Sequence, residues 1–358
     1  MFDPLFITPL ESCPDYALHG DAVMSCHRKR STKYCWSRMK HRHVHVTPLE
    51  GGHTMNQRKK QILGGVLVCV FILSLVHCDA LKAGTAEKQA YILEKDVVYG
   101  TGGDVELTLD LARPTTGKGP FPALVFLFGG GYRSGSKSRW YSEIREAAKR
   151  GYVAVAINYR LTRELENGKP KYPFPAQVHD GKCAVRWIRA NARTYTIDQN
   201  RIGVVGFSAG GNLALMLGLT DSSDGLEGDC GNGGMSSRVQ AVVNLAGGTD
   251  LVLHYQIYPF YYGALVGGTP EQVPERYKAA SPLTYVSPDD PPVLSLCGTS
   301  DHVLPQEELL DERMRAVGAS HTLIVKEGVG HSQFALANFS KDNPVWEFFE
   351  THLKKGEE

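Results

Sequence analysis

The sequence has almost no net charge, few cysteines in its main part and no internal repeat. Its 39 Lys and Arg residues nearly balance its 38 Asp and Glu residues, so the chain has no overall field that attracts nucleic acid. An apolar content of 42% is too high for a disordered chain, and 38 glycines without a triplet period exclude a collagen. The absence of a recurring segment excludes solenoids and propellers. The 358 residues suffice for one large globular domain with additions, or for two smaller domains.

The first sixty residues differ in charge from the rest of the chain. Residues 1–60 contain 10 Lys and Arg residues against 5 Asp and Glu residues, whereas the remainder contains 29 against 33. Six of the 13 histidines and three of the eight cysteines fall within residues 1–54. Their spacing fits no paired-ligand zinc pattern, so we expect no metal site there. We interpret residues 1–54 as a leader outside the working protein, with Met55 as the true start.

A long apolar segment follows this leader. Residues 61–78 contain no charged side chain, and the three basic residues 58–60 directly precede them. A basic flank before an apolar run of about 7–15 residues is typical of an export signal. We therefore interpret residues 55–80 as a signal peptide cleaved after Ala80. A retained membrane anchor and a lipid attached to Cys78 are the two alternatives.

This interpretation predicts an exported protein, either periplasmic or extracellular. Any contact with a membrane is then limited to the N-terminal segment, if that segment is retained. We interpret residues 81–90 as a linker and expect a single folded domain over residues 91–358.

Three cysteines follow the apolar segment, namely Cys183, Cys230 and Cys297. An odd number supports no disulfide framework and allows at most one bridge. Cys183 and Cys297 lie in apolar stretches, so we expect both to be core residues.

Apolar, β-branched runs alternate with helical patterns through the main part of the chain. The expected strands are Ala123–Phe128, Val153–Asn158, Ile202–Phe207, Val239–Leu245, Val293–Cys297 and Thr322–Val325. The expected helices are Tyr141–Lys149, Gln177–Asn191, Gly210–Leu219, Gln306–Val317 and Val345–Lys354. Two earlier segments, Tyr91–Tyr99 and Val105–Leu111, alternate in polarity as an antiparallel edge hairpin does. The pattern predicts an α/β fold with a mostly parallel central sheet and helices on both faces.

Ser208 lies in the segment G-F-S-A-G-G, residues 206–211, directly after an expected strand and before an expected helix. This is the G-x-S-x-G pattern in the context that its chemistry requires. The turn is so tight that a side chain at Gly206 or Gly210 would overlap neighbouring backbone. It also places the N–H of Ala209 at the start of a helix, where the dipole favours negative charge. We predict that Ser208 is a catalytic nucleophile.

A serine nucleophile needs a base, and the base needs an orienting acid. On this type of turn the order along the chain is serine, acid, histidine. Asp301 follows the expected strand Val293–Cys297, so it lies at a carboxyl end of the sheet, where such sheets place their sites. His331 follows the last strand in a loop. We predict that Asp301 is the acid and His331 the base. The less favoured candidates are Asp289 and Asp290, which precede their strand, His302, which neighbours the acid, and His321, which begins a strand.

Three successive glycines, residues 129–131, follow the expected strand Ala123–Phe128. Without side chains they allow backbone N–H groups to turn into the site, so we predict Gly130, Gly131 and Ala209 as donors to an oxyanion. These glycines do not form a G-x-G-x-x-G that opens a helix, so no dinucleotide is expected. We expect neither a cofactor nor a metal.

Eight segments of the chain, in order, resemble the α/β-hydrolase esterases. They are F-G-G-G-Y-R-S-G (128–135), N-Y-R-L (158–161), H-D-G-K-C-A-V-R-W-I-R (179–189), G-F-S-A-G-G (206–211), G-G-T-D-L (247–251), A-S-P-L-T-Y-V (280–286), G-T-S-D (298–301) and G-H-S-Q-F (330–334). The chain is most similar to the feruloyl- and acetylxylan-esterase-like (BD-FAE-like) group, related to hormone-sensitive-lipase-type carboxylesterases. The resemblance covers roughly Val97 to Leu353. It implies an α/β-hydrolase fold with a small cap segment, and a serine hydrolase that cleaves carboxylic esters through an acyl-enzyme. Acetyl or feruloyl esters on plant polysaccharide are the substrates it suggests.

The chain departs from this family's pattern at Phe128, where the family usually has a histidine that holds the oxyanion loop. We expect packing by Phe128 to replace it, which leaves the geometry of the loop open. Asp180 resembles a structural position of the family, and we expect it to pair with a nearby arginine rather than to act in catalysis.

The aromatic segment Tyr255–Tyr262 lies between two expected strands, where such folds insert a cap over the site. Aromatic walls suit an apolar or aromatic acyl group, or the face of a sugar. We therefore take Tyr132, Tyr258 and Tyr262 as candidate substrate contacts, with packing under the cap as the alternative. Residues 221–234 are typical of a surface loop and lack the ligand pattern of a calcium loop.

The expected partner is a small ester or an acylated carbohydrate, and no nucleic acid. One alternative function is amide hydrolysis of the arylformamidase or prolyl-oligopeptidase-like type. The other is a catalytically silent binding module on the same fold. The presence of Ser208, Asp301 and His331 together argues against the silent module.

Overall fold

The computed structural model describes residues 90–163, 165–335 and 343–354, which belong to one compact unit. The expected leader (1–54) and signal segment (55–80), and all but the last residue of the expected linker (81–90), lie outside the described residues. Within the described residues, no helix combines the length and the apolar character that crossing a membrane requires.

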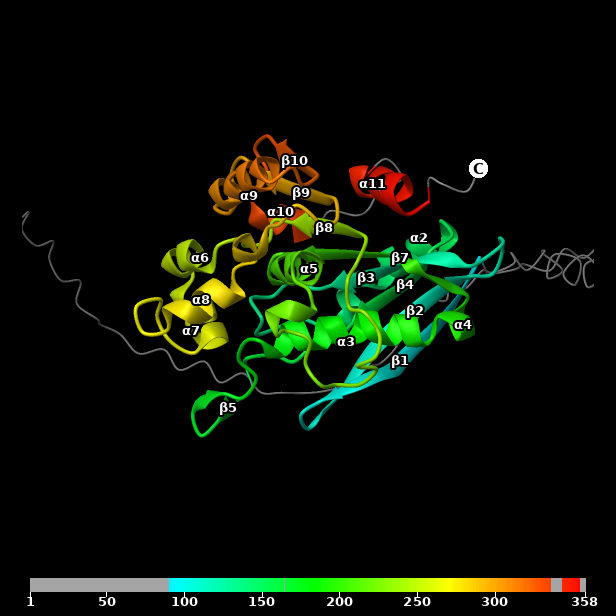
Figure 1. Ribbon diagram of the computed structural model, residues 1–358, viewed down its shortest axis with the longest axis horizontal. Helices are drawn as coiled ribbons and strands as arrows, with labels where there is room; N and C mark the ends of the chain where they lie inside the picture. The colour runs from blue at the N-terminus through cyan, green and yellow to red at the C-terminus, as the bar shows by residue number, and fades with distance from the viewer. Residues whose placement is uncertain (1–89, 164, 336–342, 355–358) are drawn as a thin grey trace, which may run out of the picture. The chain divides into compact units, whose positions relative to one another are not determined.

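An eight-stranded sheet forms the centre of the domain (Figure 1). In spatial order its strands are β1 (Tyr91–Gly102), β2 (Val105–Pro114), β4 (Val153–Ile157), β3 (Phe121–Leu127), β7 (Ile197–Phe207), β8 (Ala241–Leu245), β9 (Val293–Gly298) and β10 (His321–Lys326). The pairings of β1 with β2 and of β2 with β4 are antiparallel, and the other pairings in this sheet are parallel. The prediction of a mostly parallel sheet with an antiparallel hairpin at its edge is confirmed. A separate small hairpin joins β5 (Leu165–Glu166) to β6 (Lys169–Pro170).

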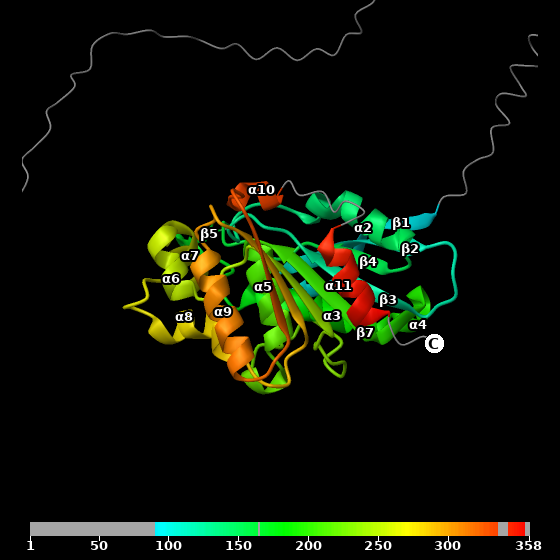
Figure 2. The same ribbon diagram turned by 90° about the horizontal axis from the view of Figure 1, so that it is seen from above.

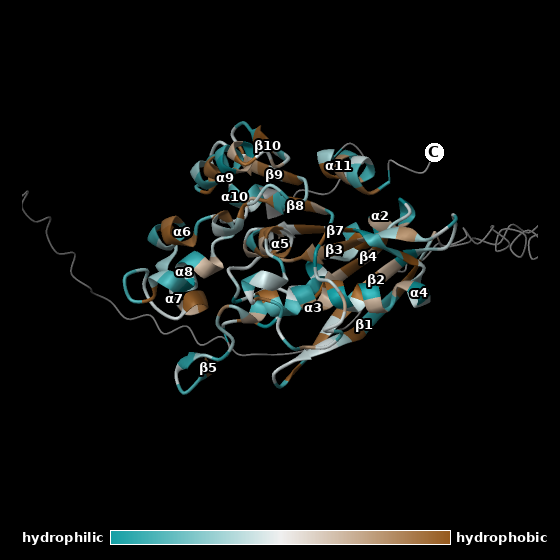
Figure 3. Ribbon diagram, in the orientation of Figure 1, coloured by the Kyte–Doolittle hydropathy of each residue, from teal (hydrophilic) through white to brown (hydrophobic). Residues whose placement is uncertain are grey.

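Helices cover both faces of this sheet (Figures 1 and 2). Helices α2 (Tyr141–Lys149) and α11 (Pro344–Leu353) pack on one face, whereas α3 (Ala176–Ala190) and α5 (Ala209–Leu219) pack on the other. Strands β4 and β8 are buried along their whole length, and the central strands are accordingly brown in Figure 3. Coverage on both faces is the reason that these strands are continuous apolar runs rather than alternating ones. Outside the cap, the other helices are α4 (Ala192–Tyr195), α9 (Leu304–Ala316), α10 (His331–Ala335) and the 3₁₀ helices Lys137–Trp140, Ser222–Asp224 and Pro282–Tyr285.

Three short helices that the sequence pattern did not predict form the cap. They are α6 (Leu251–Ile257), α7 (Pro259–Val266) and α8 (Pro274–Ala280), which lie together in both views. The carboxylate of Asp250 accepts from the first backbone N–H groups of α6, and a proline at the first position begins each of α7 and α8. Helices of seven or eight residues are too short to show a clear period, so only their start signals were available in the sequence.

One disulfide joins α3 to the loop at residues 221–234, between Cys183 and Cys230. The sequence allowed one bridge but did not indicate which two cysteines form it. Cys183 and Cys297 are both fully buried, as expected, and Cys297 is free.

Asp180 on α3 is fully buried and pairs with Arg160, which follows β4. Its carboxylate accepts from the backbone N–H of Arg160 at 2.8 Å and from Nη2 of the guanidinium at 2.6 Å. The structural pairing expected for this residue is therefore present, and it ties α3 to the sheet.

Replacement of Asp180 by alanine is expected to lower the free energy of unfolding by about 3–5 kcal/mol, because the Arg160 side chain, which is only 12% exposed, loses its counter-ion. The matched control is Asp104→Ala, which breaks an exposed pair with Lys171 and is expected to cost far less. Urea unfolding of the two variants measures the difference. Equal losses would contradict a structural role for the buried pair.

Candidate active site

Ser208 occupies a strained turn between β7 and α5. Its backbone has φ 55° and ψ −119°, a conformation that a residue with a side chain rarely adopts. A Cβ atom at Gly206 would overlap the carbonyl oxygen of Gly210, and one at Gly210 would overlap that of Leu127. Glycine at both positions therefore permits the turn, as the sequence predicted, and the turn raises Ser208 Oγ into a pocket.

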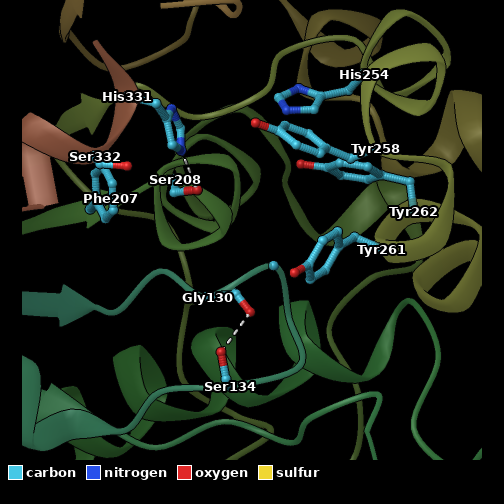
Figure 4. Close-up of a pocket in the computed structure, with 11 residues that line it drawn as sticks. Gly130, Ser134, Phe207, Ser208, His254, Tyr258, Tyr261, Tyr262, His331 and Ser332 are labelled. Atoms are coloured by element: carbon cyan, nitrogen blue, oxygen red, sulfur yellow. Dashed lines mark hydrogen bonds between the residues drawn. The ribbon is translucent and has the colours of Figure 1, made fainter. Parts of the chain in front are cut away.

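Ser208 and His331 line this pocket and contact each other there (Figure 4), and Asp301 contacts His331 from behind. His331 Nε2 lies 2.8 Å from Ser208 Oγ, and His331 Nδ1 lies 3.0 Å from Asp301 Oδ2. The Asp301 side chain is fully buried after β9 and also accepts from the backbone N–H of Val303 at 3.1 Å. His331 is the first residue of α10 and stays partly exposed. The arrangement supplies a hydroxyl, a base in contact with it and a carboxylate behind the base.

The less favoured acids and one of the less favoured histidines lie elsewhere. Asp289 pairs with Arg238, and the carboxylate of Asp290 accepts from Ser287. His321 is turned to Asp311 at 2.9 Å and to Ser295 at 3.1 Å, away from Ser208.

His302, in contrast, lies directly beside His331 and Asp301. Its ring centroid is 5.1 Å from that of His331, and its Nδ1 is 3.5 Å from Asp301 Oδ1. Burial lowers the pKa of His302. The sequence placed it next to the acid but gave no sign that its ring turns toward the same carboxylate.

The glycine loop after β3 bends beside Ser208. Gly130 and Gly131 both have positive φ, at 129° and 58°, and within the described part of the chain neither N–H has a hydrogen-bond acceptor. A Cβ atom at Gly131 would overlap the ring of Tyr261. Ala209 is the first residue of α5, so its N–H also has no acceptor within the helix. These three N–H groups are the predicted oxyanion donors.

Phe128 anchors this loop through Tyr159. The two rings stack with centroids 4.1 Å apart and an interplanar angle of 10°, and the Tyr159 hydroxyl donates to the Phe128 carbonyl at 2.7 Å. Both side chains are buried. The loop is therefore held by aromatic stacking and one hydrogen bond, where the family usually has a histidine.

Tyr132 does not have the position expected of a substrate contact. Its ring is buried, and its hydroxyl donates to Asn212 Oδ1 on α5 at 2.7 Å. Asn212 in turn donates to the carbonyl of Gly248 at 2.8 Å. Tyr132 thus links the glycine loop to the helix that follows Ser208, and it is not among the residues that line the pocket.

The cap supplies one wall of the pocket, which has a volume of about 320 Å³. The predicted contacts Tyr258 and Tyr262 line it, and so does Tyr261 of the same aromatic segment. His254 also lines it, and the sequence did not single that residue out. Burial, and then the charge of His302, lowers the pKa of His254 to about 4, so its imidazole is neutral at neutral pH. The hydroxyl of Ser208 therefore faces a pocket whose wall on the cap side is neutral and largely aromatic.

The BD-FAE family model matches residues 109–313, which is more than half of the chain. The chain belongs to the BD-FAE family. The matched range includes Gly130, Ser208 and Asp301, and His331 follows it.

Several relatives and solved structures similar to this BD-FAE chain are described as esterases. Esterase LipC of Mycobacterium tuberculosis is 31% identical over 275 residues, which are 73% of this chain and 65% of LipC. A truncated carbohydrate esterase from gut microbiota has a TM-score of 0.61 and 26% identity, and the match covers 74% of this chain and 95% of that one. An esterase of the planctomycete Thermogutta terrifontis has a TM-score of 0.60 and 27% identity, over 76% and 96% of the two chains. The α/β-hydrolase fold and the family resemblance are confirmed.

In this BD-FAE chain, Gly130→Ala is expected to lower kcat by about 10²–10³-fold, the usual cost of a lost oxyanion donor. The added Cβ atom would overlap the carbonyl oxygen of Ser134 and displace the loop. Gly318→Ala is the matched control, because Gly318 also has positive φ (79°) but no atom of the described residues lies within 4 Å of an added Cβ. Steady-state kinetics on one short ester compares them. An equal fall in both variants would rule out a specific role of the Gly130 loop.

Proposed function

We propose that the protein hydrolyses carboxylic esters, with Ser208 as nucleophile, His331 as base and Asp301 as the orienting acid. The observation that carries this proposal is the 2.8 Å contact between Ser208 Oγ and His331 Nε2 inside the pocket. The esterase relatives support the same reaction class. The chain spans 65% of the length of LipC, so the activity of the whole protein is part of the proposal.

The reaction proceeds in two halves. His331 Nε2 takes the proton of Ser208 Oγ as that oxygen attacks the ester carbonyl, and the N–H groups of Gly130, Gly131 and Ala209 stabilise the oxyanion. The C–O bond then breaks, and His331 gives the proton to the leaving alcohol. Water attacks the acyl-enzyme with His331 again as base, which releases the acid and restores Ser208.

Acetyl or feruloyl esters on plant polysaccharide are the proposed substrates. A cavity of about 320 Å³ is at the small end of the range for ligand pockets, which suits a short or planar acyl group. The rings of Tyr258, Tyr261 and Tyr262 provide faces for an aromatic acid or a sugar. A structural neighbour is described as a carbohydrate esterase, which supports the same class.

The proposal is tested with p-nitrophenyl acetate, acetylated xylan, a feruloylated sugar and N-formylkynurenine, each with the protein and with Ser208→Ala. Release of acid from the esters by the protein alone is the expected result. Turnover of N-formylkynurenine in place of every ester would replace the proposal with amide hydrolysis. No turnover of any of the four would leave a binding module.

We also propose that the protein is exported. The uncharged residues 61–78 after three basic residues support this, and so does the disulfide between Cys183 and Cys230, because disulfides persist in oxidising compartments. Mass spectrometry of the protein from its native cell should find a mature chain that begins near Leu81. A full-length chain with both thiols free to alkylate would contradict export.

A further inference from the structure

Two histidine rings approach the same buried carboxylate. His331 Nδ1 lies 3.0 Å from Asp301 Oδ2, and His302 Nδ1 lies 3.5 Å from Asp301 Oδ1. One ligand atom from each of these three residues falls within 4.8 Å of the others. The proposed reaction uses His331 and Asp301 and leaves His302 without a role.

His302 lacks hydrogen-bond partners in the part of the chain that the structure describes. Its Nε2 is buried and unpaired, and its Nδ1 is too far from Asp301 for a good hydrogen bond. Asp301 Oδ1 already accepts from the backbone N–H of Val303 at 3.1 Å and lies 3.2 Å from His331 Nδ1. The carboxylate of Asp301 already has its hydrogen-bond donors, so His302 does not need to donate to it. The imidazole nitrogen of His302 and the carboxylate are instead suited to bind the same cation.

We propose that Asp301, His302 and His331 bind a divalent transition-metal ion such as Zn²⁺, and that the bound ion stops ester hydrolysis. Two imidazole nitrogens and one carboxylate oxygen are a ligand set that zinc accepts, with a water as the fourth ligand. Metal–ligand distances of about 2.0–2.2 Å in a tetrahedral site place ligand atoms about 3.4 Å apart. Asp301 Oδ1 lies 3.2 Å from His331 Nδ1 and 3.5 Å from His302 Nδ1, which is close to this value.

The ion has a route to these ligands from solvent. The side chains of His302 and His331 are 24% and 23% exposed, whereas that of Asp301 is fully buried. His331 lines the open pocket that also holds Ser208. Small rotations of the two partly exposed rings bring their nitrogens to one ion while the carboxylate stays in place.

Inhibition follows from the single proton of a neutral imidazole. When a metal binds His331 Nδ1, the proton of that ring moves to Nε2. Nε2 then donates toward Ser208 Oγ and no longer accepts its proton, so the hydroxyl is not activated. Because the metal also binds Asp301, the contact that orients His331 is lost at the same time.

The inhibition half of the inference rests on the proposed esterase function, but binding does not, so binding is measured first. Isothermal calorimetry of full-length Ser208→Ala with Zn²⁺ is expected to show a specific site, and His302→Gln in the same background is expected to weaken that site at least tenfold. Loss of a group that only hydrogen-bonds to a metal ligand already lowers metal affinity by about 10–100-fold. His352→Gln, an exposed position on α11, is the matched control and should bind as Ser208→Ala does. The histidines and cysteines of residues 1–54 are present in every arm and cancel.

Activity is then followed with p-nitrophenyl acetate in the presence of Zn²⁺, relative to each variant's own rate without metal. The protein and His352→Gln should be inhibited and recover with EDTA, and the midpoint for His302→Gln should be at least tenfold higher. His302→Phe, which keeps a ring against Tyr258, serves if the glutamine variant does not fold. Equal Zn²⁺ binding with and without His302 would overturn the site. Binding that depends on His302 without inhibition of an active enzyme would overturn the inhibition, and absence of esterase activity would overturn the proposed function instead.

Discussion

His331→Ala should lower kcat/KM for short esters by at least about 10⁴-fold. In the structure His331 Nε2 is the group 2.8 Å from Ser208 Oγ, and a serine hydroxyl without a base is a poor nucleophile at neutral pH. The substitution removes one residue of the pocket lining but leaves the glycine loop and the aromatic wall in place, so KM should change far less than kcat. Steady-state kinetics with p-nitrophenyl acetate and with a less reactive alkyl ester measure kcat and KM.

The double variant of Ser208 and His331 provides the control for this prediction. If the two side chains act as one unit, Ser208→Ala combined with His331→Ala should lose no more activity than either single variant. Losses that multiply would mean that the residues contribute independently, and a His331→Ala protein with more than a hundredth of the activity would refute the base assignment.

Asp301→Asn is expected to lower kcat by about 10³–10⁴-fold with little effect on stability. The buried carboxylate accepts from His331 Nδ1, whereas an amide nitrogen in its place would donate to that atom. His331 then carries its proton on Nε2, which faces Ser208 and cannot act as a base. Kinetics together with thermal unfolding separate this loss of activity from loss of the fold.

Asp289→Asn is the matched control for that variant. Asp289 is also an aspartate beside a sheet strand, but it is exposed and pairs with Arg238. Its substitution is expected to leave kcat unchanged. A similar fall in both variants, or an Asp301→Asn protein that keeps more than a tenth of the activity, would disprove the assignment of the acid.

Local features of the sequence were sufficient for much of the fold and for the three central side chains. Strands such as β8 are buried on both faces, so their apolar runs could be recognised without knowledge of their neighbours. The turn at Ser208 depends on glycines two residues before and after it, within one short segment. Asp301 and His331 were predicted because each follows a recognisable strand at the carboxyl edge of the sheet.

Other features depend on residues that are distant in the sequence, and no local pattern contains them. The stack of Phe128 on Tyr159, the link from Tyr132 to Asn212 and the choice of Cys230 for the disulfide arise when separate elements pack together. The approach of His302 to Asp301 is of the same kind, because ring orientation depends on what surrounds it.

The sequence by itself therefore determined the sheet, the tight turn at Ser208 and the order of the candidate catalytic residues. These follow from burial periodicity and from backbone sterics over a few residues. Only the tertiary structure decided the cap helices, the pocket wall with His254 and Tyr261, and the support of the glycine loop by Phe128 and Tyr159. Each of those is a contact between distant segments, and its geometry is set by close packing that the linear pattern does not encode.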